Sequence, residues 1–171
     1  MLSKLDLDFI VKLKEVPEDF PAHLEREQVA EYLANRKAEA YIPELEQNDL
    51  LITADTIVVL GKQILNKPAD EAEACSMLQQ LSGNQHDVIT GVCLCSPVKK
   101  EIFHDVTRVY FKNLTEEEIN FYVQQYKPYD KAGAYGAQEW MGMVAIDRIE
   151  GSYFNVMGLP VHKLYMHLMN F

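Results

Sequence analysis

The sequence LLITADTIVVLGKQILNKP, residues 50–68, decides the fold class of this chain. Two apolar runs rich in β-branched residues, 50–52 and 57–60, flank the polar residues 53–56. A Gly61-Lys62 pair then leads into a second short apolar run. β-branched residues bounded by turn residues predict a mostly buried strand that continues into a hairpin.

Asp55 lies in the middle of this predicted strand. An unpaired buried charge is strongly disfavoured, so a carboxylate kept in such a run commonly serves metal binding, proton transfer or an ion pair. The alternative is a bulge or turn in which Asp55 hydrogen-bonds to nearby amides. The stretch alone leaves both interpretations open.

The composition is typical of a globular enzyme with one domain, residues 1–171, of which 48% are hydrophobic and 25% charged. The net charge of −10 argues against partners such as nucleic acid or an anionic membrane surface. It does not exclude a phosphorylated small molecule, which a few local lysines and a divalent metal can hold. No apolar run approaches the roughly 20 residues of a transmembrane helix, and the amino terminus does not have a signal-peptide pattern.

Three cysteines are present, and two of them, Cys93 and Cys95, form a C-x-C pair. Both thiols would share one face of a strand, which predicts buried small hydrophobes and not a zinc or redox site. Free cysteines and the lack of a signal peptide together indicate a reducing cytoplasm.

Strands and helices are predicted to alternate along the rest of the chain. The predicted strands are residues 9–13, 87–96, 101–111 and 144–149, and the predicted helices are 24–45, 70–81, 115–126 and 152–169. Asp70, Thr115 and Ser152 are the expected helix caps, and Gly158 and Pro160 are expected to bend the last helix. The long central hairpin predicts an α/β fold, with a mixed β-sheet flanked by helices and not a purely parallel one.

Four segments contain polar residues that packing of a hydrophobic core does not explain. They are Glu18-Asp19, Lys37, Asp55-Thr56 with Lys67, and residues 131–138. Lysines neutralise phosphates, carboxylates hold a divalent ion, and one carboxylate can orient or deprotonate an attacking water. The combination predicts phosphate chemistry. The sequence contains neither a Walker A loop nor G-x-G-x-x-G nor G-x-S-x-G, and its five histidines show no metal spacing.

The segment KAGAYGAQ, residues 131–138, is predicted to be an irregular loop. Gly133 and Gly136 allow the backbone to approach a ligand closely, and Gln138 can form paired hydrogen bonds with an amide-like edge. Lys131 could add charge near phosphates or form a structural ion pair with Asp130 or Glu139. A simple connector is the alternative interpretation of this loop.

Several of these motifs together resemble the Maf family of nucleoside triphosphate pyrophosphatases. They are ITADT followed by Asn66-Lys67-Pro68, LSGNQHDVITGV (81–92), DKAGAYGAQ (130–138) and IEGSYFNVMGLP (149–160). They span nearly the whole chain in order. The segment AYGAQ, residues 134–138, resembles the corresponding segment in the branch of the family that acts on dTTP and UTP.

The resemblance implies a fold similar to that of inosine triphosphate pyrophosphatases. It implies hydrolysis of a nucleoside triphosphate between the α and β phosphates, with a divalent metal such as Mg²⁺ or Mn²⁺ as cofactor. Asp55 matches the family's catalytic aspartate, and Glu18 matches an acidic residue near the metal. Lys37 and Lys67 match lysines that face the phosphates, and Thr56 and Gln138 match positions associated with base selection. A homodimer and a role in restraining cell division, at septum formation, are also implied.

The chain departs from the family at its amino terminus. Family members normally begin with a buried strand and a Ser-x-Ser-Pro-Arg-Arg loop, whereas the first residues here, MLSKLDLDF, resemble the segment that follows that loop. Its arginines would be expected to grip the triphosphate, and lysine does not easily replace bidentate guanidinium contacts. The missing strand should leave an unpaired edge in the sheet.

Two explanations of this departure stay open, a truncated chain and a natural short form, and weak or no hydrolysis is expected of the second. The leading hypothesis is a cytoplasmic, metal-dependent dTTP/UTP pyrophosphatase. The alternatives are a non-catalytic nucleotide-binding or regulatory protein, and a domain in which Asp55 is only structural.

Overall fold

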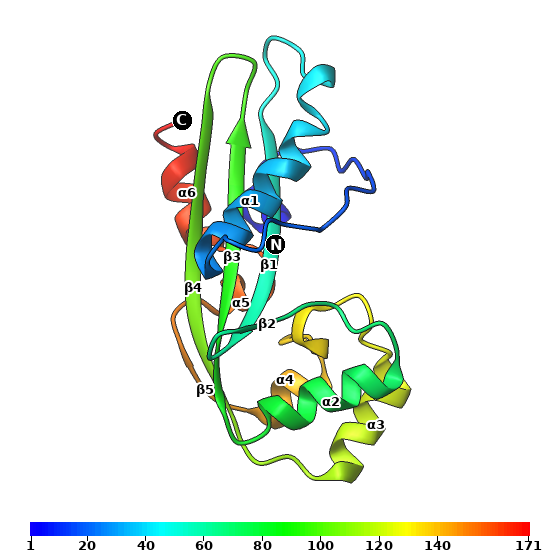
Figure 1. The fold of residues 1–171 in the computed structure, drawn as a ribbon. Helices are drawn as coiled ribbons and strands as arrows, with labels where there is room; N and C mark the ends of the chain where they lie inside the picture. The colour runs from blue at the N-terminus through cyan, green and yellow to red at the C-terminus, as the bar shows by residue number, and fades with distance from the viewer.

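Five strands form one sheet in the order β2-β1-β3-β4-β5, in a computed structural model that describes residues 1–171 (Figure 1). All four strand pairings are antiparallel. The strands are β1 (Leu51–Leu60), β2 (Gln63–Leu65), β3 (Gln85–Cys95), β4 (Lys100–Phe111) and β5 (Ile146–Glu150). The prediction of an α/β fold with a sheet flanked by helices is confirmed.

β1 runs without interruption through the polar residues in its middle. Asp55 lies opposite Gly91 of β3 and Thr56 lies opposite Thr90, in a register without a bulge. The interpretation of Asp55 as part of a bulge or turn is therefore wrong. The Gly61-Lys62 turn joins β1 to β2, as the predicted hairpin requires.

The edge of β1 that faces away from β3 is only partly paired. β2 pairs with residues 58–60, so residues 51–57 have no strand partner on that side. This confirms the expectation of an unpaired edge. The edge leaves room for a cavity beside the middle of the strand.

One face of the sheet is covered by α1 (Arg26–Glu39), which crosses β1 and β3 (Figure 1). Its buried side includes three alanines, Ala30, Ala34 and Ala38. The helix comes so close to β3 that a Cβ atom on Gly91 would lie 2.2 Å from the carbonyl oxygen of Ala30. Small residues on the helix and a glycine on the strand therefore permit this packing.

The other face carries α5 (Tyr153–Val156) and α6 (Val161–Leu168) on its upper half. Below them, α2 (Glu71–Leu81), α3 (Glu116–Tyr126) and α4 (Trp140–Ala145) enclose the largest core cluster, which has 17 buried residues. Short 3-10 turns, η1 (Leu2–Leu5), η2 (Ile42–Glu44) and η3 (Ala132–Ala134), complete the order of elements.

The predicted helix caps are confirmed. Asp70 Oδ1 accepts a hydrogen bond from the Glu73 amide at 2.9 Å, and Thr115 and Glu118 form a reciprocal capping box. The Ser152 side chain caps α5. Cys93 and Cys95 are buried against α1, as predicted for small hydrophobes, and all three cysteines are free.

Two predicted elements near the amino terminus are wrong. Residues 9–13 form no strand: Ile10 is 85% and Leu13 91% exposed, and alternation alone cannot form a strand without a partner. The helix predicted for 24–45 ends at Glu39, and a separate 3-10 turn, Ile42–Glu44, follows it, because the ring of Pro43 disfavours a continuous helix.

The carboxyl-terminal half differs from the prediction in two places. Residues 140–145 form α4, so β5 begins at Ile146 and not at residue 144. A six-residue helix is too short to be stable alone and depends on packing, which local sequence does not reveal. The predicted closing helix is two helices, separated at Gly158 and Pro160, the two residues expected to bend it.

No helix in the structure combines the length and the apolar character needed to cross a membrane.

His86, near the start of β3, is a buried titratable group and 2% exposed. Its Nε2 atom lies 2.7 Å from the hydroxyl of Tyr135, and its ring packs edge-on against Phe111. Burial lowers the pKa of His86 from 6.5 to about 4, against the opposing charge of Asp87. The folded protein therefore holds this imidazole neutral.

This burial predicts a loss of stability in mild acid. The unfolded chain takes up a proton on His86 below pH 6.5, whereas the folded chain does so only near pH 4. The free energy of unfolding should therefore fall by up to about 3 kcal/mol over that interval. Urea denaturation from pH 7 to 4 measures this fall in the free energy of unfolding. The His86→Gln variant, which lacks the imidazole, should show a smaller fall. The same pH dependence in both proteins would contradict this assignment.

Candidate functional site

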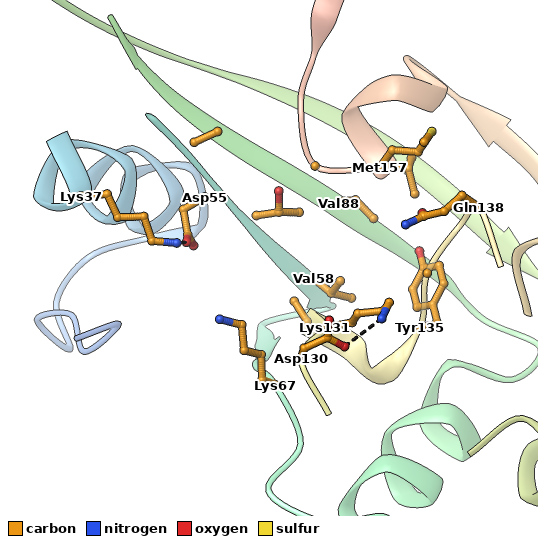
Figure 2. Close-up of a pocket in the computed structure, with 16 residues that line it drawn as sticks. Lys37, Asp55, Val58, Lys67, Val88, Asp130, Lys131, Tyr135, Gln138 and Met157 are labelled. Carbon is orange, nitrogen blue, oxygen red and sulfur yellow. Dashed lines mark hydrogen bonds and ion pairs between the residues drawn. The ribbon is translucent and has the colours of Figure 1, made fainter. Parts of the chain in front are cut away.

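A cavity of about 260 Å³ opens beside the unpaired edge of β1 (Figure 2). Three groups of side chains surround it: charged residues at one end, apolar residues at the other, and the loop after α3 beneath them. Its lining includes Lys37, Asp55, Thr56, Val58, Lys67, Val88, Asp130, Lys131, Tyr135, Gln138, Met157 and Gly158.

The cavity reaches both faces of the sheet because successive side chains of β1 point to opposite sides. Asp55 faces α1, where it contacts Lys37. Thr56 faces the opposite side, where its hydroxyl lies 2.8 Å from that of Thr90. Both residues line the same cavity, so one ligand can contact both of them.

Four charged side chains form a chain of ion pairs at one end of the cavity. Lys37 Nζ contacts the Asp55 carboxylate and lies 3.2 Å from Glu18 Oε1. Lys67 Nζ donates to both oxygens of Glu18, at 2.7 and 2.6 Å. The two lysines are thus held by two carboxylates, with Glu18 between them.

The pKa values of these groups follow from burial and pairing. Burial raises the pKa of Asp55 above its ordinary value, and the opposing attraction of Lys37 does not cancel this effect. Burial alone would lower the pKa of Lys37, but the Asp55 and Glu18 carboxylates raise it, so the ammonium stays charged. For Glu18, burial is outweighed by Lys67 and Lys37, which lower its pKa.

The loop beneath the cavity is held by a buried tyrosine. The Tyr122 hydroxyl donates to the Glu139 carboxylate and accepts from the Gly136 amide at 3.1 Å. Glu139 in turn lies 3.2 Å from Lys131, which also pairs with Asp130 at 2.8 Å. Lys131 therefore has the structural ion pairs considered for it, and it also lines the cavity.

The opposite end of the cavity carries apolar side chains, beside the Asp130–Lys131 ion pair. Val58, Val88 and Met157 line it, and Figure 2 shows them with Tyr135 and Gln138 on the side away from Lys37. The Gln138 side chain is exposed. A flat ring with polar edges suits these surroundings, because apolar walls bind its faces and an amide meets its edge.

The carboxylates suit a metal ion that is shared with a ligand. Glu18 and Asp55 both contact the Lys37 ammonium, so their oxygens converge on one cation. No group of three or more His, Cys, Asp and Glu side chains that could hold a metal ion lies together in the structure, so an ion here would need ligands from a bound molecule. Mg²⁺ commonly binds through one or two carboxylates together with substrate phosphates, and this pair matches that need.

The structure brings together all the site residues predicted from sequence: Glu18, Lys37, Asp55, Thr56, Lys67 and Gln138. Sequence reasoning missed Thr90, which lies behind Thr56, and Val88, Tyr135 and Met157 in the apolar part. Thr90 and Met157 lie in motifs that carry the family resemblance, but only the register between β1 and β3 places Thr90 next to Thr56.

Comparison with known proteins identifies the family of this chain. The sequence model described as Maf-like protein matches residues 1–171. This chain belongs to that family. A relative from Flavobacterium psychrophilum named dTTP/UTP pyrophosphatase is 50% identical over 168 residues, which is 98% of this chain and 86% of the relative.

Two further relatives of this Maf-like protein carry the same name. The protein of Porphyromonas gingivalis strain W83 is 50% identical over 174 residues, covering 100% of this chain and 87% of the relative. That of Parabacteroides distasonis is 47% identical over 172 residues, covering 100% and 89%. The similarity thus extends over every element that builds the cavity.

We expect Tyr122→Phe to destabilise this Maf-like protein. The change leaves the buried Gly136 amide without its acceptor, which should lower the free energy of unfolding by about 1–3 kcal/mol in urea denaturation. Tyr110→Phe is the matched control, because its hydroxyl bonds to the exposed Glu150, and it should change stability by less than about 0.5 kcal/mol. Equal effects of the two substitutions would contradict the role given to Tyr122.

Proposed function

We propose that this protein hydrolyses dTTP and UTP to the nucleoside monophosphate and pyrophosphate, with a divalent metal ion as cofactor. The observation that carries the proposal is the buried Asp55 carboxylate, paired with Lys37 and close to Lys67, at the charged end of a cavity with an apolar far end. Support also comes from the relatives named dTTP/UTP pyrophosphatase, which are about half identical to this chain.

In this proposal the lysines bind the triphosphate. Lys37, Lys67 and Lys131 line the cavity, and no arginine does. Each ammonium has three donors, so Lys37 and Lys67 can contact a phosphate while they keep their contacts with Asp55 and Glu18. Electrostatic stabilisation of the charge that develops on the phosphate oxygens is the expected contribution of these side chains.

Asp55 serves as the proton acceptor for the attacking water. The water oxygen bonds to the α-phosphorus, the bond from that phosphorus to the bridging oxygen breaks, and pyrophosphate leaves with the bond electrons. The proton of the water goes to Asp55, whose pKa is raised by burial and thereby brought closer to neutrality. Lys37 holds the Asp55 carboxylate in place for this step.

Glu18 and Asp55 would hold the metal ion together with the phosphates. When bound, a divalent ion supplies Lewis-acid stabilisation of the phosphoryl oxygens and of the leaving group. Glu18 also holds Lys67, so it couples the metal to the phosphate-binding lysine.

The base is assigned to the apolar end of the cavity. Val58 and Val88 face the ring there, and Thr56 and Gln138 meet its polar edge. All these residues come from one chain, so the proposal does not depend on the homodimer, which stays a prediction. A cytoplasmic location is proposed on the basis of the three free cysteines.

Asp55→Asn is expected to lower turnover by about 10²–10⁴-fold, because the amide cannot accept the proton. The melting temperature should change little, because Lys37 keeps its ion pair with Glu18 at 3.2 Å. The assay is pyrophosphate release from a panel of nucleoside triphosphates with Mg²⁺ or Mn²⁺. Nucleotide binding by the unsubstituted protein without pyrophosphate release would favour the non-catalytic alternative.

Asp87→Asn is the matched control for Asp55→Asn. Asp87 is also a buried carboxylate, held by Arg26 at 2.5 Å and Arg108 at 2.8 Å, but it does not line the cavity. Its substitution should lower the melting temperature and leave turnover unchanged, since it removes an ion pair and no cavity group. If Asp55→Asn behaved like Asp87→Asn, Asp55 would be structural only.

Chelation of divalent ions with EDTA should stop pyrophosphate release, and added Mg²⁺ or Mn²⁺ should restore it. Glu18→Gln should raise the metal concentration for half-maximal activity by about tenfold, which corresponds to about 1.4 kcal/mol of binding free energy. Full activity in EDTA would exclude the metal from this reaction.

A further inference from the structure

A chain of hydrogen bonds leads from the cavity into the interior behind Thr56. The hydroxyl oxygens of Thr56 and Thr90 are 2.8 Å apart, and the Thr90 hydroxyl lies 3.1 Å from the carbonyl oxygen of Asn155. Thr56 lines the cavity, whereas Thr90 and Asn155 are fully buried. None of these interior contacts takes part in the proposed phosphate chemistry.

The hydrogens of this chain are assigned by what each group can donate. The Asn155 carbonyl can only accept, so a hydrogen on Thr90 must lie between the two oxygens to avoid repulsion of their lone pairs. That uses the single hydrogen of Thr90, which must then accept from Thr56. The hydrogen of Thr56 therefore points inward, and its remaining lone pair faces the cavity.

The Asn155 carbonyl is held in place by the packing of α5. The Asn155 side chain donates to the carbonyl of Val88 and to the hydroxyl of Thr107, both at 3.0 Å. The Gly158 amide donates to the same Asn155 carbonyl at 2.9 Å. These contacts anchor the Asn155 carbonyl, where the series of hydrogen bonds ends, to β3 and β4. The direction of the hydrogen bonds therefore does not depend on a mobile side chain.

Gly158 also keeps the Thr56 oxygen accessible from the cavity. Its φ of 100° lies in the region that favours glycine, and even a Cβ atom there would be 3.5 Å from Thr56 Oγ1. A longer side chain would occupy the space from which a ligand approaches this oxygen.

We infer that Thr90 is a positioning residue that fixes the Thr56 hydroxyl as an acceptor, and that this acceptor selects pyrimidines with a hydrogen on ring nitrogen N3. Uracil and thymine carry that hydrogen, whereas N3 of cytosine is itself an acceptor. Cytosine would therefore place two acceptors opposite each other. The inference rests on the proposed function and names the group that discriminates at its base site.

Gln138 is not assigned this discrimination. Its amide offers both a donor and an acceptor and can match either pyrimidine by turning over. Its side chain is exposed, whereas the hydroxyl of Thr56 is oriented from the interior. Selection between uracil and cytosine is therefore assigned to the Thr56 hydroxyl, whose role as an acceptor is fixed.

The test compares kcat/KM for UTP and CTP in the unsubstituted protein, Thr90→Val and Thr90→Ser. The unsubstituted protein should favour UTP by at least about tenfold, because cytosine leaves the Thr56 acceptor unpaired. Thr90→Val frees the Thr56 hydrogen to donate to cytosine, so the UTP:CTP ratio should fall by about tenfold. Thr90→Ser keeps the hydroxyl and should keep the ratio.

Thr53→Val is the matched control. Its hydroxyl donates to the Ala34 carbonyl at 2.7 Å on the α1 side of the same strand, so its loss should not alter the ratio. An unchanged ratio in Thr90→Val, or an equal change in Thr90→Ser, would overturn the inference. If Thr90→Val does not fold, Thr56→Val removes the acceptor at a half-buried position and should abolish the preference for UTP.

Measurements of UTP and CTP binding at equilibrium test this inference independently of the proposed hydrolysis. If the unsubstituted protein releases no pyrophosphate, the proposed function fails, and calorimetric binding of UTP and CTP without metal decides the inference by itself. Tighter binding of UTP that is lost in Thr90→Val supports it. Equal binding of the two nucleotides, or no binding of either, overturns it.

Discussion

The close packing of α1 on the sheet at Gly91 is the contact on which the rest of the site depends. Gly91 lies opposite Asp55 across the β1–β3 pairing, and the alanine side of α1 rests on it. This short separation brings Lys37, further along the same helix, into contact with Asp55. Without that ammonium the carboxylate would be a buried charge with no partner, which a protein interior does not tolerate.

The alternation of side chains along β1 then separates two kinds of chemistry. Asp55 faces the helix with the lysines and Glu18, and Thr56 faces α5 with apolar neighbours. Both residues line the same cavity, so a single ligand can contact both faces. A nucleoside triphosphate has the matching division, with charge at one end and a flat ring at the other.

Features set by local sequence were predicted well. The hairpin of β1 and β2, the central strands and the helix caps depend on turn residues and on side chains three positions apart. Features set by tertiary packing were not. Residues 9–13 alternate like a strand but have no partner, and α4 is stable only within its packing.

The charged residues of the site were predictable for a different reason. A carboxylate within an apolar run conflicts with burial, so Asp55 stands out in the sequence itself. Lys37 lies in a polar stretch, and its match to a family lysine pointed to it. Thr90 does not conflict with its strand, since a threonine suits any β-strand. Its connection to Thr56 and Asn155 follows only from the register of β3 and the anchoring of α5.

A crystal structure with Mg²⁺ and a UTP analogue that has a methylene group between the α and β phosphorus atoms would test this account most directly. The account predicts phosphates beside Lys37 and Lys67, Glu18 and Asp55 on the metal, and N3 of uracil within hydrogen-bond distance of Thr56 Oγ1. A nucleotide bound in the reverse direction, or away from the free edge of β1, would contradict it.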